Sequence, residues 1–320
     1  MRLPLVVLCC AVGVLAACSG ARTATPVASC TFANPIDVGA DPWVIRHDGA
    51  YYSVESGNGG IWVYRSNALT KPRQNGVRVW TPPDTGWNRT NVWAPELHFI
   101  DGRWYIYYAA GRSGPPFTEQ RAGVLQSVSA DPQGSYTDRG KLYTGDSVAT
   151  GAHDVWAIDL TVHKLNGVLY AVWSGWLDNA TTDKTPQHLY MARMANPWTM
   201  ATNRVRISSP TADWERGPEL DLQEGPEFLE HAGQVFIIYS TRDSWLKEYE
   251  LGQLRLRTPF TDPMNPDSIV KTGPAFTGTS SVLGVGHASF TQSPDGSENW
   301  IVYHSKVDVA PGWNRVIRTQ

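Results

Sequence analysis

Several features that often define a protein's class are scarce in this sequence. All four cysteines lie within the first 30 of its 320 residues, so disulfide bonds cannot stabilise the rest of the chain. The chain has 27 Lys and Arg residues against 30 Asp and Glu, a net charge of −3 and no long run of one sign. This balance argues against a nucleic-acid partner. Helical patterns are few, and neither an EF-hand loop nor a His/Cys cluster occurs, which argues against a catalytic metal.

What the sequence has instead is aromatic residues and short strands. Trp (14) and Tyr (13) are abundant, and short runs of Val, Ile, Tyr and Trp end at Gly, Pro, Asn or Asp. Five segments repeat one pattern, a small polar turn with a glycine followed by an aromatic strand. The glycines are Gly49, Gly102, Gly167, Gly233 and Gly296, at intervals of 53, 65, 66 and 63 residues. This period predicts an all-β, five-bladed β-propeller; WD40 and kelch repeats are shorter.

A polar residue precedes each turn within an otherwise apolar strand. These residues are Asp41, Glu96, Asp159, Glu224 and His287. The first strand of each propeller blade lines the central axis, so equivalent positions would direct four carboxylates and one histidine into a common active-site funnel. Blade one is expected to begin near Asn34.

The N-terminus resembles a bacterial lipoprotein signal. Arg2 precedes an apolar stretch, residues 3–17, which is too short for a mature membrane-spanning helix. The stretch ends in Leu-Ala-Ala followed by Cys18, as in a lipobox, so Cys18 is the expected lipidation site; the alternative is an ordinary secretory signal. The expected organisation is a signal peptide (1–17), a small polar tether (18–33) and a propeller domain (34–320). The expected location is outside the cytoplasm, with the membrane contacted only through the lipid.

Five short motifs carry a resemblance to a known family. They are Gly39-Ala40-Asp41-Pro42-Trp43, Trp93-Ala94-Pro95-Glu96, Ile158-Asp159, Glu224-Gly225-Pro226 and Gly286-His287. In this order, one to a blade, they resemble glycoside hydrolase family 43. Residues 173–176, 192–198 and 313–315 resemble its arabinofuranosidase branch, although Leu177 stands where an acidic residue is often found.

The resemblance implies hydrolysis with inversion, for which one carboxylate activates water and one carboxylic acid protonates the leaving oxygen. By motif match, Asp41 is the base and Glu224 is the acid. Asp159 is the third carboxylate, which orients Glu224 and raises its pKa. Glu96 is either a further axial group or a structural hydrogen-bond acceptor.

The resemblance also implies substrate-binding residues, namely Trp43, Trp93, Trp176, His287 and Arg315. His287 is either a buried structural histidine or an axial residue close to the sugar. No cofactor is required; a structural calcium ion on the axis, held near His287 mainly through water, is one expectation.

The expected function is that of an exported, lipid-anchored, exo-acting α-L-arabinofuranosidase. Its substrate would be a plant cell-wall polysaccharide or oligosaccharide, such as an arabinan or arabinoxylan fragment. A β-xylosidase or a bifunctional relative is the alternative among enzymes. A glycan-binding lipoprotein without catalysis and a protein-interaction propeller are alternatives of other classes.

Overall fold

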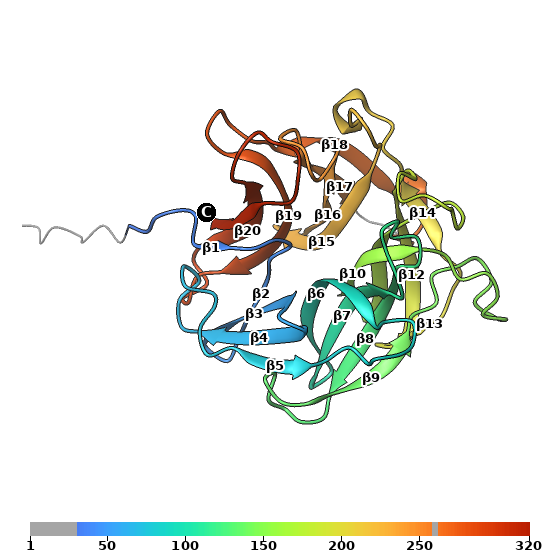
Figure 1. Ribbon diagram of the computed structural model, residues 1–320, viewed down its shortest axis with the longest axis horizontal. Coiled ribbons are helices and arrows are strands. Elements are labelled where there is room, and N and C mark those ends of the chain that lie inside the picture. The colour runs from blue at the N-terminus through green and yellow to red at the C-terminus, as the bar shows by residue number, and fades with distance from the viewer. Residues whose placement is uncertain (1–30, 258–261) are drawn as a thin grey trace, which may run out of the picture. The chain divides into compact units, whose positions relative to one another are not determined.

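Five antiparallel sheets surround one axis in the computed structural model, which describes residues 31–257 and 262–320 (Figure 1). The predicted all-β, five-bladed propeller is confirmed. Among the described residues the helices are the short 3₁₀ turns η1 (Asp213–Glu215) and η2 (Pro266–Ser268). None of the described helices is long and apolar enough to span a bilayer.

Four of the sheets are built from consecutive strands, with the first strand of each nearest the axis. The first sheet contains β2 (Trp43–His47), β3 (Ala50–Gly57), β4 (Gly60–Ser66) and β5 (Val77–Trp80). The second contains β6 (Thr90–Ile100), β7 (Arg103–Gly111), β8 (Arg121–Ser127) and β9 (Tyr136–Lys141). The third contains β10 (Ala157–Leu165), β11 (Val168–Gly175) and β12 (His188–Asn196), with β13 (Thr199–Met200) and β14 (Val205–Ser208) both paired to β12. The fourth contains β15 (Gln223–His231), β16 (Gln234–Thr241), β17 (Glu250–Leu256) and β18 (Ile269–Phe276).

The fifth sheet joins the two ends of the described chain. Its order is β1-β21-β20-β19, with the elements β1 (Asp37–Val38), β19 (Leu283–Gln292), β20 (Asn299–Lys306) and β21 (Arg315–Thr319). Asn34 reinforces this closure, because its side chain donates to Thr319 O at 2.8 Å and accepts from Thr319 N at 3.1 Å. The expectation that blade one begins near Asn34 is therefore wrong, since this segment completes the last blade.

The repeated turns connect the first and second strands of the blades. In the first four blades both central residues have positive φ, as in a type I′ hairpin; an example is Asn166 (49°) followed by Gly167 (81°). The core lies between neighbouring sheets. One cluster joins the first and fifth sheets through Val44, Tyr51 and Ile317, so apolar packing continues across the closure.

Inserted residues kink the inner strand of each of blades two to five, one each in β10 and β15 and two each in β6 and β19. The pairing register of β10 slips between Ile158 and Thr161, and similar slips occur in β6, β15 and β19. The bulged residues have left-handed backbones, and so does Asp41 just before β2. Their φ values are 50° for Asp41, 41° for Ala94, 53° for Asp159, 52° for Gly225 and 45° for His287. Such bulges redirect side chains, here at the mouth of the axis.

Candidate active site

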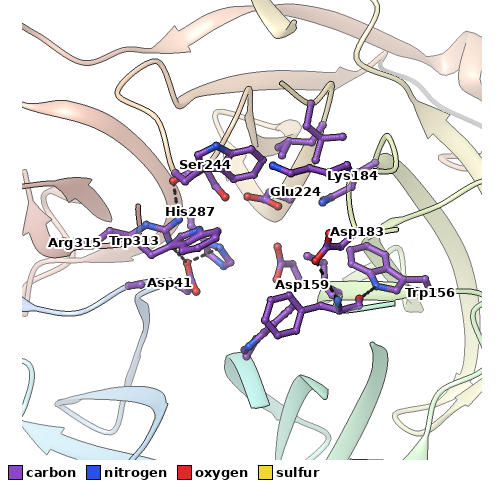
Figure 2. A pocket seen from close by; sticks show the side chains of 18 residues that line it. Asp41, Trp156, Asp159, Asp183, Lys184, Glu224, Ser244, His287, Trp313 and Arg315 are labelled. Carbon is purple, nitrogen blue, oxygen red and sulfur yellow. Dashed lines mark hydrogen bonds and ion pairs between the residues drawn. The ribbon is translucent and has the colours of Figure 1, made fainter. Parts of the chain in front are cut away.

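A cavity of about 440 Å³ opens at the bulged end of the inner strands (Figure 2). Its lining includes the charged residues Asp41, Asp159, Glu224, His287 and Arg315, which come from four different blades. We call this space the axial cavity. Pockets of this size, mostly apolar with a few convergent polar groups, are typical small-ligand sites.

Asp41 is held by cationic and polar groups from blade five. His287 Nδ1 lies 3.2 Å and Arg315 Nη1 3.4 Å from Asp41 Oδ1, and the Asp41 N–H donates to His304 Nδ1 at 3.1 Å. Burial raises the pKa of Asp41, but the charge of His287 and its hydrogen bond outweigh burial and hold the pKa well below its ordinary value. Asp41 is therefore ionised at neutral pH and can accept a proton.

Glu224 has the opposite protonation behaviour. It is 8% exposed, and burial together with the negative charge of Asp159 raises its pKa to about 7. Asp159 Oδ2 accepts a 3.0 Å hydrogen bond from the Gly225 N–H, which ties this carboxylate to the peptide after Glu224. Glu224 therefore keeps a proton to give near neutral pH.

His287 is a cation within the cavity wall. Burial lowers its pKa, but the charges of Asp41 and Asp159 outweigh burial and raise the pKa to about 9. Its backbone N–H donates to Ser240 Oγ at 2.7 Å. A Cβ on Gly225 would lie 3.1 Å from this ring, so the Glu-Gly-Pro motif needs glycine both for its positive φ and for space.

The residues around His287 do not fit direct ligation of a metal ion. A protonated imidazole paired with Asp41 has no lone pair to offer. Within residues 31–257 and 262–320, no group of three or more His, Cys, Asp or Glu side chains is arranged to hold a metal. We derive no catalytic step through a metal.

Two of the tryptophans expected to bind sugar lie outside the axial cavity. Trp43 packs between blades one and two, where its Nε1 donates to Leu97 O at 2.8 Å and its ring contacts the tilted ring of His98 at a centroid distance of 4.5 Å. Trp176 is fully buried and stacks at 4.3 Å on Trp156. These expectations are wrong, because blade two covers the Trp43 ring, and Trp156 covers the Trp176 ring from within the same blade as Trp176.

Trp93 does line the axial cavity, as expected, and so do His287 and Arg315. The structure adds aromatic residues that the sequence interpretation did not select. They are Phe117, Trp156, Trp245 and Trp313. Phe117 and Trp245 lie in loops outside the blade repeat, which carried no signal for them, whereas Trp156 directly precedes β10 and Trp313 stands in the family-like segment 313–315.

Comparison with known proteins decides the family. Residues 32–320 match the family described as glycosyl hydrolases family 43. The chain belongs to this family.

Individual relatives of this family 43 chain agree with that match. It is 35% identical over 296 residues to an extracellular exo-α-(1→5)-L-arabinofuranosidase of Streptomyces avermitilis, covering 89% of this chain and 58% of that protein. It is 31% identical to a protein of the same name from Streptomyces chartreusis, covering 91% and 89%. An α-L-arabinofuranosidase structure from Lactobacillus brevis superposes with a TM-score of 0.80 at 30% identity, covering 90% and 91%. The chain thus spans a little over half the length of the first of these relatives.

Glu96 does not occupy the same blade position as Asp159 in this family 43 chain. The bulged residue of blade two is Ala94, and Glu96 lies two residues further along β6. Glu224 is likewise one residue before its bulge, at Gly225. Only three of the five expected residues, Asp41, Asp159 and His287, share a left-handed position. The expected equivalence is wrong because an offset of one or two residues within a short strand cannot be seen in the sequence.

Glu96 belongs to a second axial layer that we define as Glu96, Thr161 and Glu227. Each of these residues directly follows the bulge of its strand. Thr161 Oγ1 donates to Glu227 Oε2 at 3.3 Å, and His98 Nε2 lies 2.9 Å from Glu96 Oε2. Burial, and for Glu96 also the charge of Glu227, raises the pKa of both carboxyls well above the ordinary value. Neither lines the axial cavity; Glu96 is buried and Glu227 half-buried, and the raised pKa favours the neutral form of each carboxyl group.

Two buried residues that the sequence interpretation missed support the acid and the base. The Tyr249 hydroxyl donates to Glu224 Oε1 at 2.9 Å, and its ring stacks at 5.6 Å on His304. Burial and the charge of Arg315 lower the pKa of His304 to about 3, so it stays neutral and accepts the Asp41 N–H. Tyr249 lies just before β17 and His304 lies on β20. Both are outside the five motifs, and only the fold brings them close to the acid and the base.

Proposed function

We propose that this family 43 chain is an exo-acting α-L-arabinofuranosidase that hydrolyses its substrate with inversion. One observation carries the proposal. Two carboxyl groups from different blades line one cavity, and their surroundings push their pKa values apart, Asp41 down and Glu224 up to about 7. General base and general acid catalysis near neutral pH needs two carboxyl groups whose pKa values differ in this way.

In the proposed reaction Asp41 accepts a proton from a water molecule while the water oxygen attacks the anomeric carbon. The bond from that carbon to the leaving oxygen breaks, and Glu224 gives its proton to this oxygen. Asp159 supports the acid through its negative charge and its bond to the Gly225 N–H. His287 and Arg315 keep Asp41 ionised and oriented.

The names of the relatives support the choice of sugar. Two Streptomyces relatives are named exo-acting arabinofuranosidases, and the superposed structure is from an arabinofuranosidase. We infer that this chain likewise releases terminal arabinofuranose, from arabinan or arabinoxylan fragments.

A screen of nitrophenyl arabinofuranoside, xyloside and galactoside, together with arabino-oligosaccharides, tests this choice. We expect the arabinofuranoside to be cleaved fastest, and nuclear magnetic resonance of the first product should show the inverted anomer. Faster cleavage of the xyloside would reassign the chain as a β-xylosidase. A retained anomer would contradict Asp41 as base, and no turnover of any compound would favour a glycan-binding protein.

We further propose that the protein is exported and anchored by a lipid on Cys18. Residues 1–30, which include this signal, lie outside the described part of the structure. The apolar segment ending in Leu-Ala-Ala-Cys and the extracellular relatives support the proposal. Mass spectrometry of the mature N-terminus tests it: we expect a diacylglyceryl group on Cys18 and loss of membrane attachment in Cys18→Ala. An unmodified peptide that starts elsewhere would contradict it.

A further inference from the structure

A fully buried serine of blade four is paired with the acid in the strand register. Ser240 stands on β16, opposite Glu224 of β15. Its exposed fraction is 0%, it does not line the axial cavity, and it lies outside the five sequence motifs. Its hydroxyl group therefore has to find its hydrogen-bond partners within the fold.

The Ser240 hydroxyl joins blade four to blade five. The register of β19 slips between Gly286 and Ser289, which takes the His287 N–H out of the regular pairing with β20. Ser240 Oγ accepts this N–H at 2.7 Å. A buried amide without a partner costs free energy, so this bond stabilises the bulge that carries His287.

A series of hydrogen bonds continues from Ser240 to the acid. The Ser240 hydroxyl also hydrogen-bonds the Tyr249 hydroxyl, which donates to Glu224 Oε1 at 2.9 Å. We call this series, from the His287 N–H through Ser240 and Tyr249 to Glu224, the acid network. Ser240 and Tyr249 are at most 1% exposed, so water does not compete for these bonds.

The hydrogen bonds of the acid network run in one direction. Ser240 has a single hydroxyl proton, and in the described part of the chain the Tyr249 oxygen is its one acceptor. If Tyr249 instead donated to Ser240, the serine proton would be buried without a partner, which is costly. Both hydroxyl groups therefore donate toward Glu224, and the Tyr249 oxygen is already occupied as an acceptor.

This direction determines which oxygen of the protonated acid carries the proton. Glu224 Oε1 faces the hydroxyl proton of Tyr249, so a proton on Oε1 would point at another proton. Oε1 is therefore the accepting oxygen, and Oε2 is the oxygen left to carry the proton of the neutral acid.

We propose that Ser240 is a positioning residue that acts through Tyr249 to keep the transferable proton of Glu224 on Oε2, where the leaving oxygen can accept it. The proposal rests on the proposed function, because it takes Glu224 as the acid. When the scissile bond breaks, its electron pair stays on the leaving oxygen, and the proton moves from Oε2 to that oxygen. Glu224 is left as a carboxylate, and its Oε1 already accepts the Tyr249 hydrogen bond.

Replacing Ser240 by alanine tests this role without changing the acid. In Ser240→Ala the Tyr249 oxygen is free to accept, so Glu224 can turn its proton toward Tyr249 and away from the leaving oxygen. We expect the ratio of kcat/KM for arabinotriose to that for nitrophenyl α-L-arabinofuranoside to fall about fivefold, because only the sugar leaving group needs the proton.

A second background checks that the effect passes through Tyr249. Tyr249→Phe has no hydroxyl group to take the proton, so adding Ser240→Ala to it should leave the ratio of that variant unchanged. An equal fall in both backgrounds would overturn the proposal, because a merely structural serine acts whether or not the Tyr249 hydroxyl is present.

Ser289→Ala is the matched control. Ser289 is 1% exposed, and its Oγ likewise accepts a backbone N–H from the next blade, that of Val44 at 3.2 Å, but it does not line the axial cavity. We expect its ratio to equal that of the parent. A fall like that of Ser240→Ala would show that loss of any buried serine hydroxyl is sufficient, and would overturn the proposal.

This proposal and the proposed function fail in different ways. An active parent whose ratio is unchanged in Ser240→Ala would overturn the role of Ser240 alone. A parent that cleaves neither substrate would refute the proposed function and this role with it. Should Ser240→Ala fail to fold in a thermal melt, Ser240→Cys is the second variant, with a similar shape and a weaker S–H donor. We then expect a smaller fall in the ratio, and an unchanged ratio would overturn the proposal.

Discussion

The hydroxyl group of Tyr249 donates a 2.9 Å hydrogen bond to Oε1 of Glu224, and both side chains are buried. This bond stabilises the ionised form of Glu224 and so opposes burial and Asp159, which raise its pKa to about 7. The pKa of the proposed acid therefore reflects a balance between Tyr249, which lowers it, and burial and Asp159, which raise it.

Removing that hydroxyl should shift the pH dependence of the reaction. In Tyr249→Phe we expect the pKa of Glu224 to rise, so the alkaline limb of the kcat/KM profile should move up by about one pH unit. Glu224 must be protonated to act, so a higher pKa extends activity to higher pH. Tyr239→Phe is the control, because Tyr239 donates at 2.7 Å to Glu215, away from the cavity. An alkaline limb that stays in place would show that Tyr249 does not control the acid.

The two main carboxylates should respond differently to the quality of the leaving group. Glu224→Ala should lose far more activity on arabino-oligosaccharides than on the nitrophenyl glycoside, because nitrophenolate departs with little protonation. Asp41→Ala should lose roughly 10²–10⁴-fold on both, because both need activated water. Steady-state kcat/KM values on the two substrates check this. Equal losses for Glu224→Ala on both would remove it as the acid.

The pair of His287 with Asp41 should make stability depend on pH. The folded-state pKa of His287 is about 9, above the ordinary value of 6.5, so its contribution is complete below about 6.5 and is lost as the pH rises through 9. The whole contribution is on the order of 3 kcal/mol. Denaturant unfolding between about pH 7 and pH 10 should show this decline in the parent and a flatter curve in His287→Gln. A decline that persists in the variant would assign it to other groups.

Gly225 should tolerate no side chain. We expect Gly225→Ala to cost about 1–3 kcal/mol of stability and most of the activity, because φ is +52° and the new Cβ would press on the His287 ring at 3.1 Å. Gly167→Ala is the matched control: its φ of +81° brings similar backbone strain, but nothing lies within 4 Å of a Cβ there. Thermal melts and kcat on an aryl arabinofuranoside separate the two effects. Full activity in Gly225→Ala would show that the His287 ring need not hold its position.

The sequence by itself determined the repeat and most of the catalytic set. The turn at Asn166-Gly167 and its counterparts depend on local backbone preferences, which act over a few residues and are therefore readable in the chain. Asp41, Glu224 and His287 stand beside Gly or Pro and Asp159 follows Ile158 in its motif, and all four do line one cavity.

Only the tertiary structure decided the details that depend on contacts between blades. In blade two Ala94 rather than Glu96 takes the left-handed bulge position, and a segment beginning at Asn34 completes the last blade, because strand pairing is settled by partners far away in the chain. Trp176 and Trp245 are the same residue type in the sequence. The first is buried under Trp156 and the second lines the cavity, because exposure is set by which neighbouring blade or loop packs against the ring. The opposite pKa shifts of Asp41 and Glu224 arise the same way, since burial and the charges of His287 and Asp159 act only once five blades bring them together.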